Sequence, residues 1–132
     1  MLEVVLFRSI RLKKLKGSYA ISQMSPGSSI PSWVDGEGFV SICRTADELS
    51  LVCLANRVPK SVMSDKGWAC FMFLGPFEFD AAGVLLSVLK PISENEMGVF
   101  AVSTFDGDMM LLKEQDVNRA TSLLISAGHI ME

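Results

Sequence analysis

The sequence of 132 residues lacks the motifs of hydrolytic and transfer enzymes. It contains a single histidine, His129, which lies near the C-terminus without an evident serine or cysteine partner in the sequence. Neither of the glycine-rich phosphate-binding motifs, GxxxxGK[ST] and GxGxxG, occurs. The sequence therefore predicts no enzyme activity, no catalytic residue and no cofactor.

Cysteine is also scarce. The three cysteines, Cys43, Cys53 and Cys70, form an odd number and lack CxxC spacing, which argues against a disulfide framework and a zinc site. Each lies in an apolar, strand-like run, so we expect reduced, buried thiols in a cytoplasmic protein. Asp106 and Asp108 lie two residues apart, but they have too few partners to hold a hard cation, and no metal site is predicted.

The chain carries little positive charge. Its net charge of −3 and its pI of about 5.1 argue against nucleic-acid binding, which normally requires a basic face. A local basic run near the N-terminus is interpreted as a solvated strand face. The members of this run are Arg8, Arg11, Lys13, Lys14 and Lys16.

Long hydrophobic runs are absent, although 49% of the residues are hydrophobic and the mean hydropathy is +0.36. A membrane-spanning helix needs about 20 apolar residues in succession, and no run approaches that length. The N-terminal stretch also lacks the features of a signal peptide. No membrane partner is predicted, and part of the apolar surface is expected to be buried between copies of the chain.

The second half of the sequence predicts the order β-α-β-β-α, with a possible last strand. A continuous apolar run at 68–74 ends at Gly75-Pro76 and is followed by a helix from Asp80, in which apolar residues recur at helical spacing up to 92. Strands are expected at 98–103 and 109–112, joined by a hairpin that contains Asp106-Gly107. A last helix from about Glu114 ends near Gly128. This order is typical of a ferredoxin-like fold of the α+β class, with an antiparallel sheet and helices on one face.

The first half predicts a weaker version of the same theme. Strands are expected at 18–24, 39–43 and 50–54, and Thr45 and Glu48 form a capping box that predicts a helical turn. The segment 25–38 is loop-like, and its Trp33 either anchors the loop to the body or forms a lid over a ligand. We interpret the connector at 56–65 as the boundary between two subdomains, at 1–63 and 64–132.

A candidate binding corner lies where the helix of the second half begins. The first N–H groups of a helix have no partner within the helix and attract carboxylates, and a glycine such as Gly83 lets a ligand approach the backbone. Asp80 has two interpretations: it caps these N–H groups, or it is the counter-charge for a ligand ammonium or guanidinium. Gly83 also has a second interpretation, in which it lets the helix pack close to a neighbouring strand.

A second polar group occurs at Ser103-Thr104-Phe105-Asp106, where a strand runs into its turn. Its hydroxyls either form local turn hydrogen bonds or contact a ligand. We expect this strand to be antiparallel to, and beside, the strand that ends at Gly75. The polar group would then lie at the opposite end of the sheet from Asp80, and a neighbouring unit would be needed to complete the site.

At these residues the chain resembles an ACT domain. The similarity rests on the run Asp80-Ala81-Ala82-Gly83-Val84-Leu85 and on the order of elements. The chain is also similar to a bacterial ACT-like family of this length, which combines an Arg-Thr-x-x-Glu-Leu-Ser segment, a strand ending in Gly-Pro and a Ser-Thr-[Tyr/Phe]-x-x-Asp hairpin. These correspond here to 44–50, 75–76 and 103–108, although Gly107 stands where that family often has threonine.

The resemblance implies two tandem ACT subdomains in a homodimer or higher homo-oligomer. It also implies a regulatory or sensor function, in which an amino acid binds at a subdomain or subunit interface, since cytosolic arginine sensors of eukaryotes carry related modules. The ligand-binding residues that we predict belong to the corner and to the hairpin. They are Phe79, Asp80, Ala82, Gly83 and Val84, together with Ser103, Thr104, Phe105 and Asp106.

Two other functions remain open on the sequence. One is a ligand-free dimerisation or protein-interaction module, in which Phe79 and Phe105 would fill the corner. The other is an enzyme of unknown type, which would require a pair of catalytic groups with strongly shifted pKa values.

Overall fold

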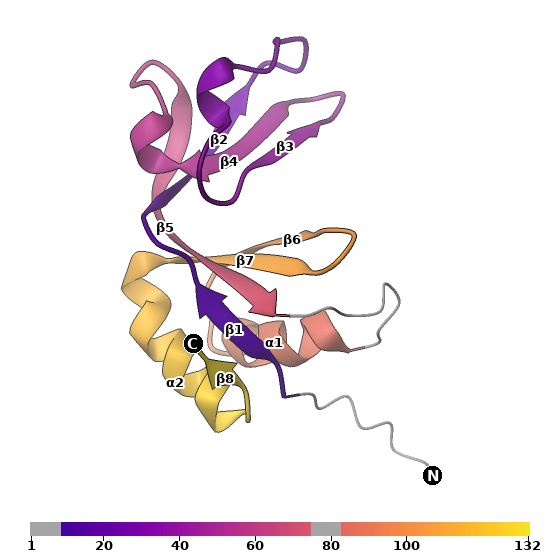
Figure 1. Cartoon of the computed structure of the whole chain (residues 1–132), viewed down its shortest axis with the longest axis vertical. Helices are drawn as coiled ribbons and strands as arrows, with labels where there is room; N and C mark the ends of the chain where they lie inside the picture. Colours follow the sequence, from indigo (N-terminus) through magenta and orange to yellow (C-terminus); the bar gives the residue numbers. More distant parts are fainter. Residues whose placement is uncertain (1–8, 75–82) are drawn as a thin grey trace. The chain divides into compact units, whose positions relative to one another are not determined.

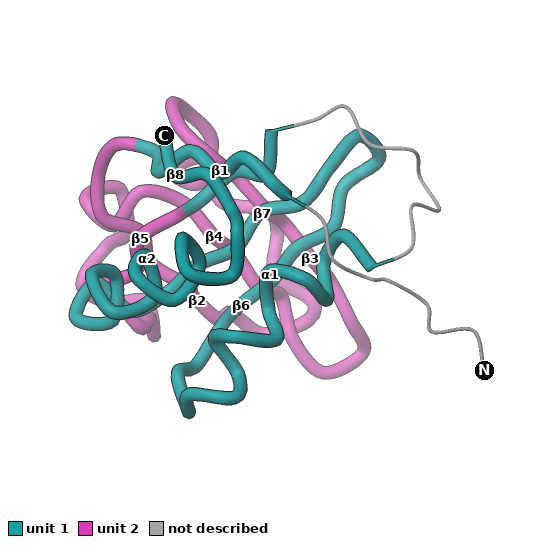
Figure 2. Tube along the Cα trace, turned by 90° about the horizontal axis from the view of Figure 1, so that it is seen from below, with its two compact units in different colours: residues 1–15, 71–132 teal, residues 16–70 magenta. Residues whose placement is uncertain are grey.

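The fold is that of a computed structural model, which describes residues 9–74 and 83–132. The chain divides into two compact units (Figures 1 and 2). Residues 16–70 form unit 2, and the residues up to 15 and from 71 onwards form unit 1. The predicted division into subdomains 1–63 and 64–132 stays a prediction.

Unit 2 consists of strands joined by very short helical segments. Its sheet has the order β3-β4-β2-β5. Along the chain the elements are β2 (Tyr19–Met24), the 3₁₀ turn η1 (Ser32–Val34), β3 (Ser41–Arg44), β4 (Leu49–Leu54), the 3₁₀ turn η2 (Ala55–Arg57) and β5 (Met63–Leu74). The last four residues of β5 belong to unit 1. Unit 2 therefore has the strand order of a ferredoxin-like fold with 3₁₀ turns in place of its helices.

The core of unit 2 lies on one face of this sheet. Alternate residues of β2 and β4 point to it, and Val34 from η1 and Val58 after η2 cover them. Trp33 packs against this cluster and thereby anchors its loop to the body of the unit. This agrees with the first of the two interpretations of Trp33. The buried members of the cluster are Ala20, Val34, Leu49, Leu51, Cys53 and Val58.

Two details of unit 2 differ from the prediction. Thr45 does accept hydrogen bonds from the amides of Asp47 and Glu48, at 3.1 and 3.2 Å, but the segment is the turn of the β3–β4 hairpin and not a helical turn. A threonine side chain satisfies turn amides as well as helix amides, so the motif does not distinguish the two. Cys43 is exposed and not buried, because β3 pairs with β4 alone among the described strands and has a short, largely solvated surface.

Unit 1 contains the predicted helices. Its strands follow the order β6-β7-β5-β1-β8. Along the chain the elements are β1 (Arg11–Lys14), the end of β5, α1 (Val84–Ser93), β6 (Val99–Ser103), β7 (Asp108–Lys113), the 3₁₀ turn η3 (Glu114–Asp116), α2 (Val117–Ser126) and β8 (Ile130–Met131). The ferredoxin-like α+β fold predicted from the sequence is confirmed, with β1 inserted between β5 and β8.

Each helix of unit 1 buries one face. The buried residues of α1 are Val84, Val88 and Ile92, and those of α2 are Ala120 and Leu124, so burial recurs every four residues as the sequence predicts. The two helices pack against each other. Full burial of one such aliphatic side chain contributes about 1.5–3 kcal/mol to folding. The basic residues of β1 are exposed, as expected for a solvated strand face.

Helix α2 ends at the glycine that the sequence identifies. Gly128 has a φ of 96°. Its amide donates a hydrogen bond to the carbonyl oxygen of Ile125 at 2.9 Å, and the amide of His129 donates one to the carbonyl oxygen of Leu124 at 3.0 Å. This pair of hydrogen bonds is a Schellman motif, which requires the left-handed conformation that glycine adopts without strain. The chain then reverses into β8, beside β1.

Candidate functional site

The binding corner predicted from the sequence is only partly within the described residues. Phe79, Asp80 and Ala82 lie outside them. Gly83 precedes α1 in a left-handed conformation with a φ of 81°, and it contributes no side-chain cap to the helix. Val84, the first residue of α1, is 5% exposed and packs its side chain inward. The helix start thus has the glycine backbone that the prediction requires.

The polar residues of the hairpin bond to one another. The hydroxyl of Ser103 lies 2.6 Å from Oδ1 of Asp108, and the hydroxyl of Thr104 bonds to the backbone of Gly107. These contacts correspond to the local turn bonding that was one of the two interpretations of the hydroxyls. Phe105, at the tip of the hairpin, is 82% exposed. It therefore does not fill the corner, as the interaction-module hypothesis would require of it.

The position predicted for this hairpin, at the end of the sheet opposite the corner, is wrong. β6 pairs with β7 and does not lie beside β5, which pairs with β7 and β1. β6 follows β5 through a helical crossover, and such a crossover makes the two strands parallel, so both run to the same end of the sheet. A Cβ on Gly107 would lie 3.8 Å from the carbonyl oxygen of Phe73, near the end of β5. Figure 1 shows the hairpin tip, the end of β5 and the start of α1 on the same side of unit 1. The described residues of the corner, Gly83 and Val84, therefore share one end of unit 1 with the hairpin.

The single histidine has a structural partner that the sequence does not reveal. Pro91 has no N–H, so the carbonyl of Ser87, four residues earlier in α1, lacks its usual helical donor. Nε2 of His129 lies 2.9 Å from this carbonyl, and Nδ1 accepts a hydrogen bond from the amide of Ile10 at 3.1 Å. An amide can only donate, so the proton of the neutral ring is on Nε2. His129, which is 4% exposed, thereby joins α1 to the segment before β1.

The buried thiols are poor nucleophiles. Burial raises the pKa of the Cys70 thiol to about 12. It also raises the pKa of Cys53, although the neighbouring Arg57 opposes this effect. Tyr19 likewise has a raised pKa because it is buried, against the effect of the hydrogen bond from the Phe39 amide to its hydroxyl. These groups hold their protons at neutral pH and serve packing.

The remaining chemistry of the described residues is limited. In the parts of the chain at 9–74 and 83–132, no three His, Cys, Asp or Glu side chains come together to hold a metal ion. None of the helices found there is both long and apolar enough to cross a bilayer.

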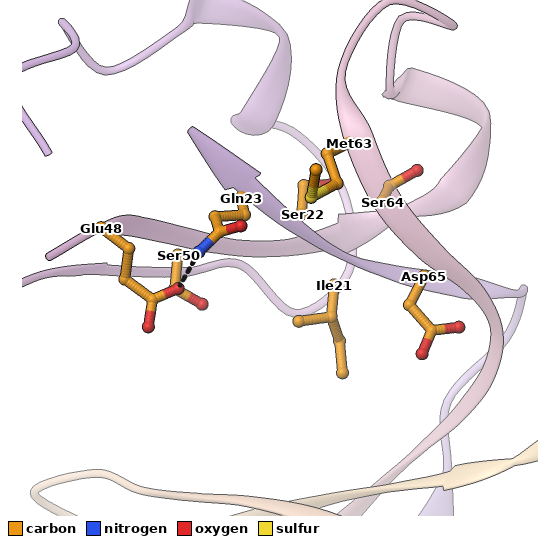
Figure 3. Close-up of a pocket in the computed structure, with 8 residues that line it drawn as sticks. All are labelled: Ile21, Ser22, Gln23, Glu48, Ser50, Met63, Ser64 and Asp65. Atoms are coloured by element: carbon orange, nitrogen blue, oxygen red, sulfur yellow. Dashed lines mark hydrogen bonds between the residues drawn. The ribbon is translucent and has the colours of Figure 1, made fainter. Parts of the chain in front are cut away.

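The sequence did not predict a shallow polar hollow on the sheet of unit 2 (Figure 3). Its volume is about 260 Å³, and residues of β2, β4 and β5 line it, together with Glu48 just before β4. The signal that could have found it is the presence of polar residues within two strands, Ser22 and Gln23 in β2 and Ser50 in β4. The lining residues are Ile21, Ser22, Gln23, Glu48, Ser50, Met63, Ser64 and Asp65.

Family models match both halves of the chain. The family model of the ACT domain matches residues 63–126, and a model that describes an N-terminal domain matches residues 17–61. Among curated proteins, none matches the chain significantly.

Solved structures extend the similarity to nearly the whole chain. The X-ray structure of a protein from Agobacterium tumefaciens is 52% identical, with a TM-score of 0.91, and the match covers 95% of this chain and 93% of that one. A Vibrio cholerae protein of unknown function, described as a possible transport protein, is 13% identical with a TM-score of 0.73 and 91% of each chain covered.

The aspartate kinase of Clostridium acetobutylicum, described as an allosteric enzyme, shares the fold at 12% identity and a TM-score of 0.62. The match covers 90% of this chain and 34% of the kinase, so the chain corresponds to about a third of that enzyme. The match of residues 63–126 to the ACT domain and the high identity to the Agobacterium protein show that this chain is an ACT-domain protein of the same family as that relative.

Proposed function

We propose that this chain is a regulatory protein that binds an amino acid. The proposal is supported by the ACT domain at 63–126 and by the fold that the chain shares with part of the aspartate kinases. One aspartokinase of this fold, from E. coli, was crystallised with aspartate and ADP in its R-state, and with lysine and aspartate in its T-state. A ligand that binds two conformations unequally shifts the equilibrium between them.

The observation that carries the proposed site is the shared end of unit 1. The ligand carboxylate would meet backbone N–H groups near Gly83 and Val84, where the helix start favours negative charge. The ligand ammonium would meet Asp106, with Ser103, Thr104 and Phe105 beside it. Phe79, Asp80 and Ala82 belong to the proposed site but lie outside the described residues. Since β5 and β6 run to one end, a single unit can supply both groups.

The proposal includes self-association in the cytoplasm. Unit 1 has an outer strand, β6, which pairs only with β7 among the described strands, and such an edge can pair with another copy of the chain. A homodimer or higher homo-oligomer would let ligand binding at one unit change an interface. Small-molecule binding without enzyme activity remains the proposed role.

The test is differential scanning fluorimetry against each of the twenty amino acids. A ligand at 100 times its Kd stabilises the folded state by about 2.7 kcal/mol, which gives a readily measured rise in Tm. Asp106→Asn should abolish the rise. Glu94→Gln, which changes the same charge at the other end of α1, should retain it. A chain that shows no rise with any amino acid at millimolar concentration would contradict the proposal.

A further inference from the structure

We propose that His129 is a positioning residue that couples the start of α1 to the sheet edge formed by β1 and β8. The inference deepens the proposed function and rests on it for its signal, because the start of α1 belongs to the proposed amino-acid site. All of the residues involved lie in unit 1, and hydrogen bonds join them in succession. Occupancy of the site at one end of this succession would be felt at the edge strands at the other end.

The first turn of α1 is connected to His129 through Ser87. The amide of Ser87 donates a hydrogen bond to the carbonyl of Gly83 at 2.9 Å, so Ser87 closes the first turn of the helix. The carbonyl of Ser87 accepts the hydrogen bond from Nε2 of His129, also at 2.9 Å. A displacement of the Gly83 backbone therefore moves the group that the His129 ring contacts.

Pro91 is the reason that this hydrogen bond leaves the helix. In a regular helix the carbonyl of Ser87 would accept from the amide of residue 91, and the first turn would be held by the turn that follows it. Proline has no N–H, so this carbonyl is bonded to a side chain from the segment between α2 and β8 instead. The start of α1 thus has a partner outside the helix.

The other nitrogen of the ring continues the connection to two strands. Nδ1 of His129 accepts a hydrogen bond from the amide of Ile10 at 3.1 Å, and the carbonyl of Ile10 accepts one from the amide of Ile130 at 3.0 Å. Ile10 directly precedes β1, and Ile130 begins β8 (Figure 1). β8 pairs with β1 alone among the described strands, and Ile130 is 49% exposed, so a change at this edge is accessible to a partner.

The ring is suited to transmit a displacement because it is buried and bonded on both sides. His129 is 4% exposed, and a backbone group is the partner of each nitrogen. The neutral ring holds one donor and one acceptor in a fixed geometry. Breaking either hydrogen bond would leave a buried backbone group without this partner, which is unfavourable. The segment before β1 therefore follows a shift of the Ser87 carbonyl.

Nuclear magnetic resonance of the ¹⁵N-labelled full chain tests the coupling without any ligand. Gly83→Ala disturbs the start of α1, because residue 83 has a φ of 81° that alanine adopts only with strain. We expect this substitution to shift the amide resonances of Ile10 and Ile130 as well as those of α1. Gly98→Ala is the matched control in unit 1 and should leave both amides unmoved, since residue 98 has no positive φ and its new Cβ meets no atom within 4 Å.

Two further variants interrupt the connection at different points. In a His129→Leu background, Gly83→Ala should no longer shift the Ile10 amide. In a His129→Gln background the shift should return, because the glutamine side chain also carries one donor group and one acceptor group. Pro91→Ala keeps His129 and gives the Ser87 carbonyl a helical donor, so it should reduce the shift even if the leucine variant does not fold. Circular dichroism checks the fold of each variant.

Three results would overturn the proposal. They are an Ile10 amide that does not respond to Gly83→Ala in the otherwise unchanged chain, a response that persists in the Pro91→Ala background, and a glutamine variant that behaves as the leucine variant does. These results do not depend on amino-acid binding, since no amino acid is present. Failure of the proposed function would appear instead in the fluorimetry, as the absence of any rise in Tm.

Discussion

The two units arrange their strands in the same way but cover their sheets differently. In unit 1 the crossovers carry the helices α1 and α2, each ten residues long, whereas in unit 2 the equivalent crossovers carry 3₁₀ turns of three residues. The strand order β3-β4-β2-β5 nevertheless repeats the order β6-β7-β5-β8, once β1 is set aside. The comparison teaches that this order does not depend on full helices.

The difference has a cause in the sequence. The crossover at 84–93 has apolar residues at helical spacing, and its Pro91 stands in the last turn. The crossover at 25–40 contains Pro26 and Pro31, and its Gly36 and Gly38 have positive φ. Such a segment cannot form a regular helix of any length.

Side-chain hydrogen bonds supplement the short 3₁₀ segments that cover the sheet of unit 2. The guanidinium of Arg57 donates to the carbonyls of Glu37 and Val34, at 3.0 and 3.2 Å. The hydroxyl of the buried Tyr19 accepts a hydrogen bond from the amide of Phe39 at 3.0 Å. Unit 2 therefore relies on side-chain hydrogen bonds to its loop, whereas unit 1 relies on helix packing.

The largest effect is expected where helix packing is removed. Leu124→Ala in α2 should lower the free energy of unfolding by about 2–5 kcal/mol, because Leu124 is 0% exposed and leaves a cavity. Val34→Ala in η1 removes two side-chain carbons where Leu124→Ala removes three, and it should cost about 2 kcal/mol. Urea denaturation measures both. A larger loss for Val34→Ala would mean that the 3₁₀ cover is the more important of the two.

The next largest loss of stability is expected from removing His129, whose ring replaces the backbone N–H that Pro91 lacks as the partner of the Ser87 carbonyl. His129→Ala should cost about 2–4 kcal/mol, since the Ile10 amide and the Ser87 carbonyl both lose a buried partner. In a Pro91→Ala background, residue 91 gains an N–H that can bond to Ser87. The cost of removing His129 should then fall by about 1 kcal/mol. Strictly additive losses in this double-mutant cycle would refute the compensation between Pro91 and His129.

A smaller effect is expected in the loop of unit 2. Gly38→Ala should destabilise the chain by about 1–2 kcal/mol, because residue 38 has a φ of +82° and its new Cβ would lie 2.5 Å from the Tyr19 hydroxyl. Gly27→Ala in the same loop has no atom within 4 Å of the new Cβ and serves as the control. Thermal unfolding should leave the control near the wild-type Tm; equal losses would show that the tie through Tyr19 is unimportant.

The smallest effect is a loss of stability at alkaline pH. The folded state keeps the proton of Cys70, whose pKa is about 12, while the unfolded chain releases it in the usual thiol range. The unfolded state thus binds fewer protons above that range, and stability falls as pH rises. We expect a loss of about 1 kcal/mol between pH 8 and pH 10 in urea denaturation. Cys70→Ala should flatten this slope, although Tyr19 and Cys53 contribute in the same direction. An unchanged slope would exclude Cys70 as its source.

Much of the fold could be predicted because periodicity is local. The helix predicted in the region after Asp80, the hairpin around Asp106-Gly107 and the end of α2 at Gly128 all follow from patterns within a few residues. The exposed Cys43 could not be predicted in this way, because its burial depends on which strand lies beside β3.

The candidate site was harder to predict than the fold. The residues of the corner and the hairpin could be chosen from sequence, but their relation required the sheet order, and placing β6 beside β5 put the hairpin at the wrong end. The link between Pro91 and His129 joins residues far apart in sequence, and the hollow of unit 2 joins three strands. Such sites depend on tertiary contacts that no local pattern contains.

The most direct measurement of the proposed function is a nuclear magnetic resonance titration of the ¹⁵N-labelled chain with the amino acid that raises Tm most. The account predicts saturable shifts of the Gly83 and Val84 amides together with those of Ser103 to Asp106, from one binding event. Shifts confined to residues 16–70, or spectra unchanged by every amino acid, would contradict it.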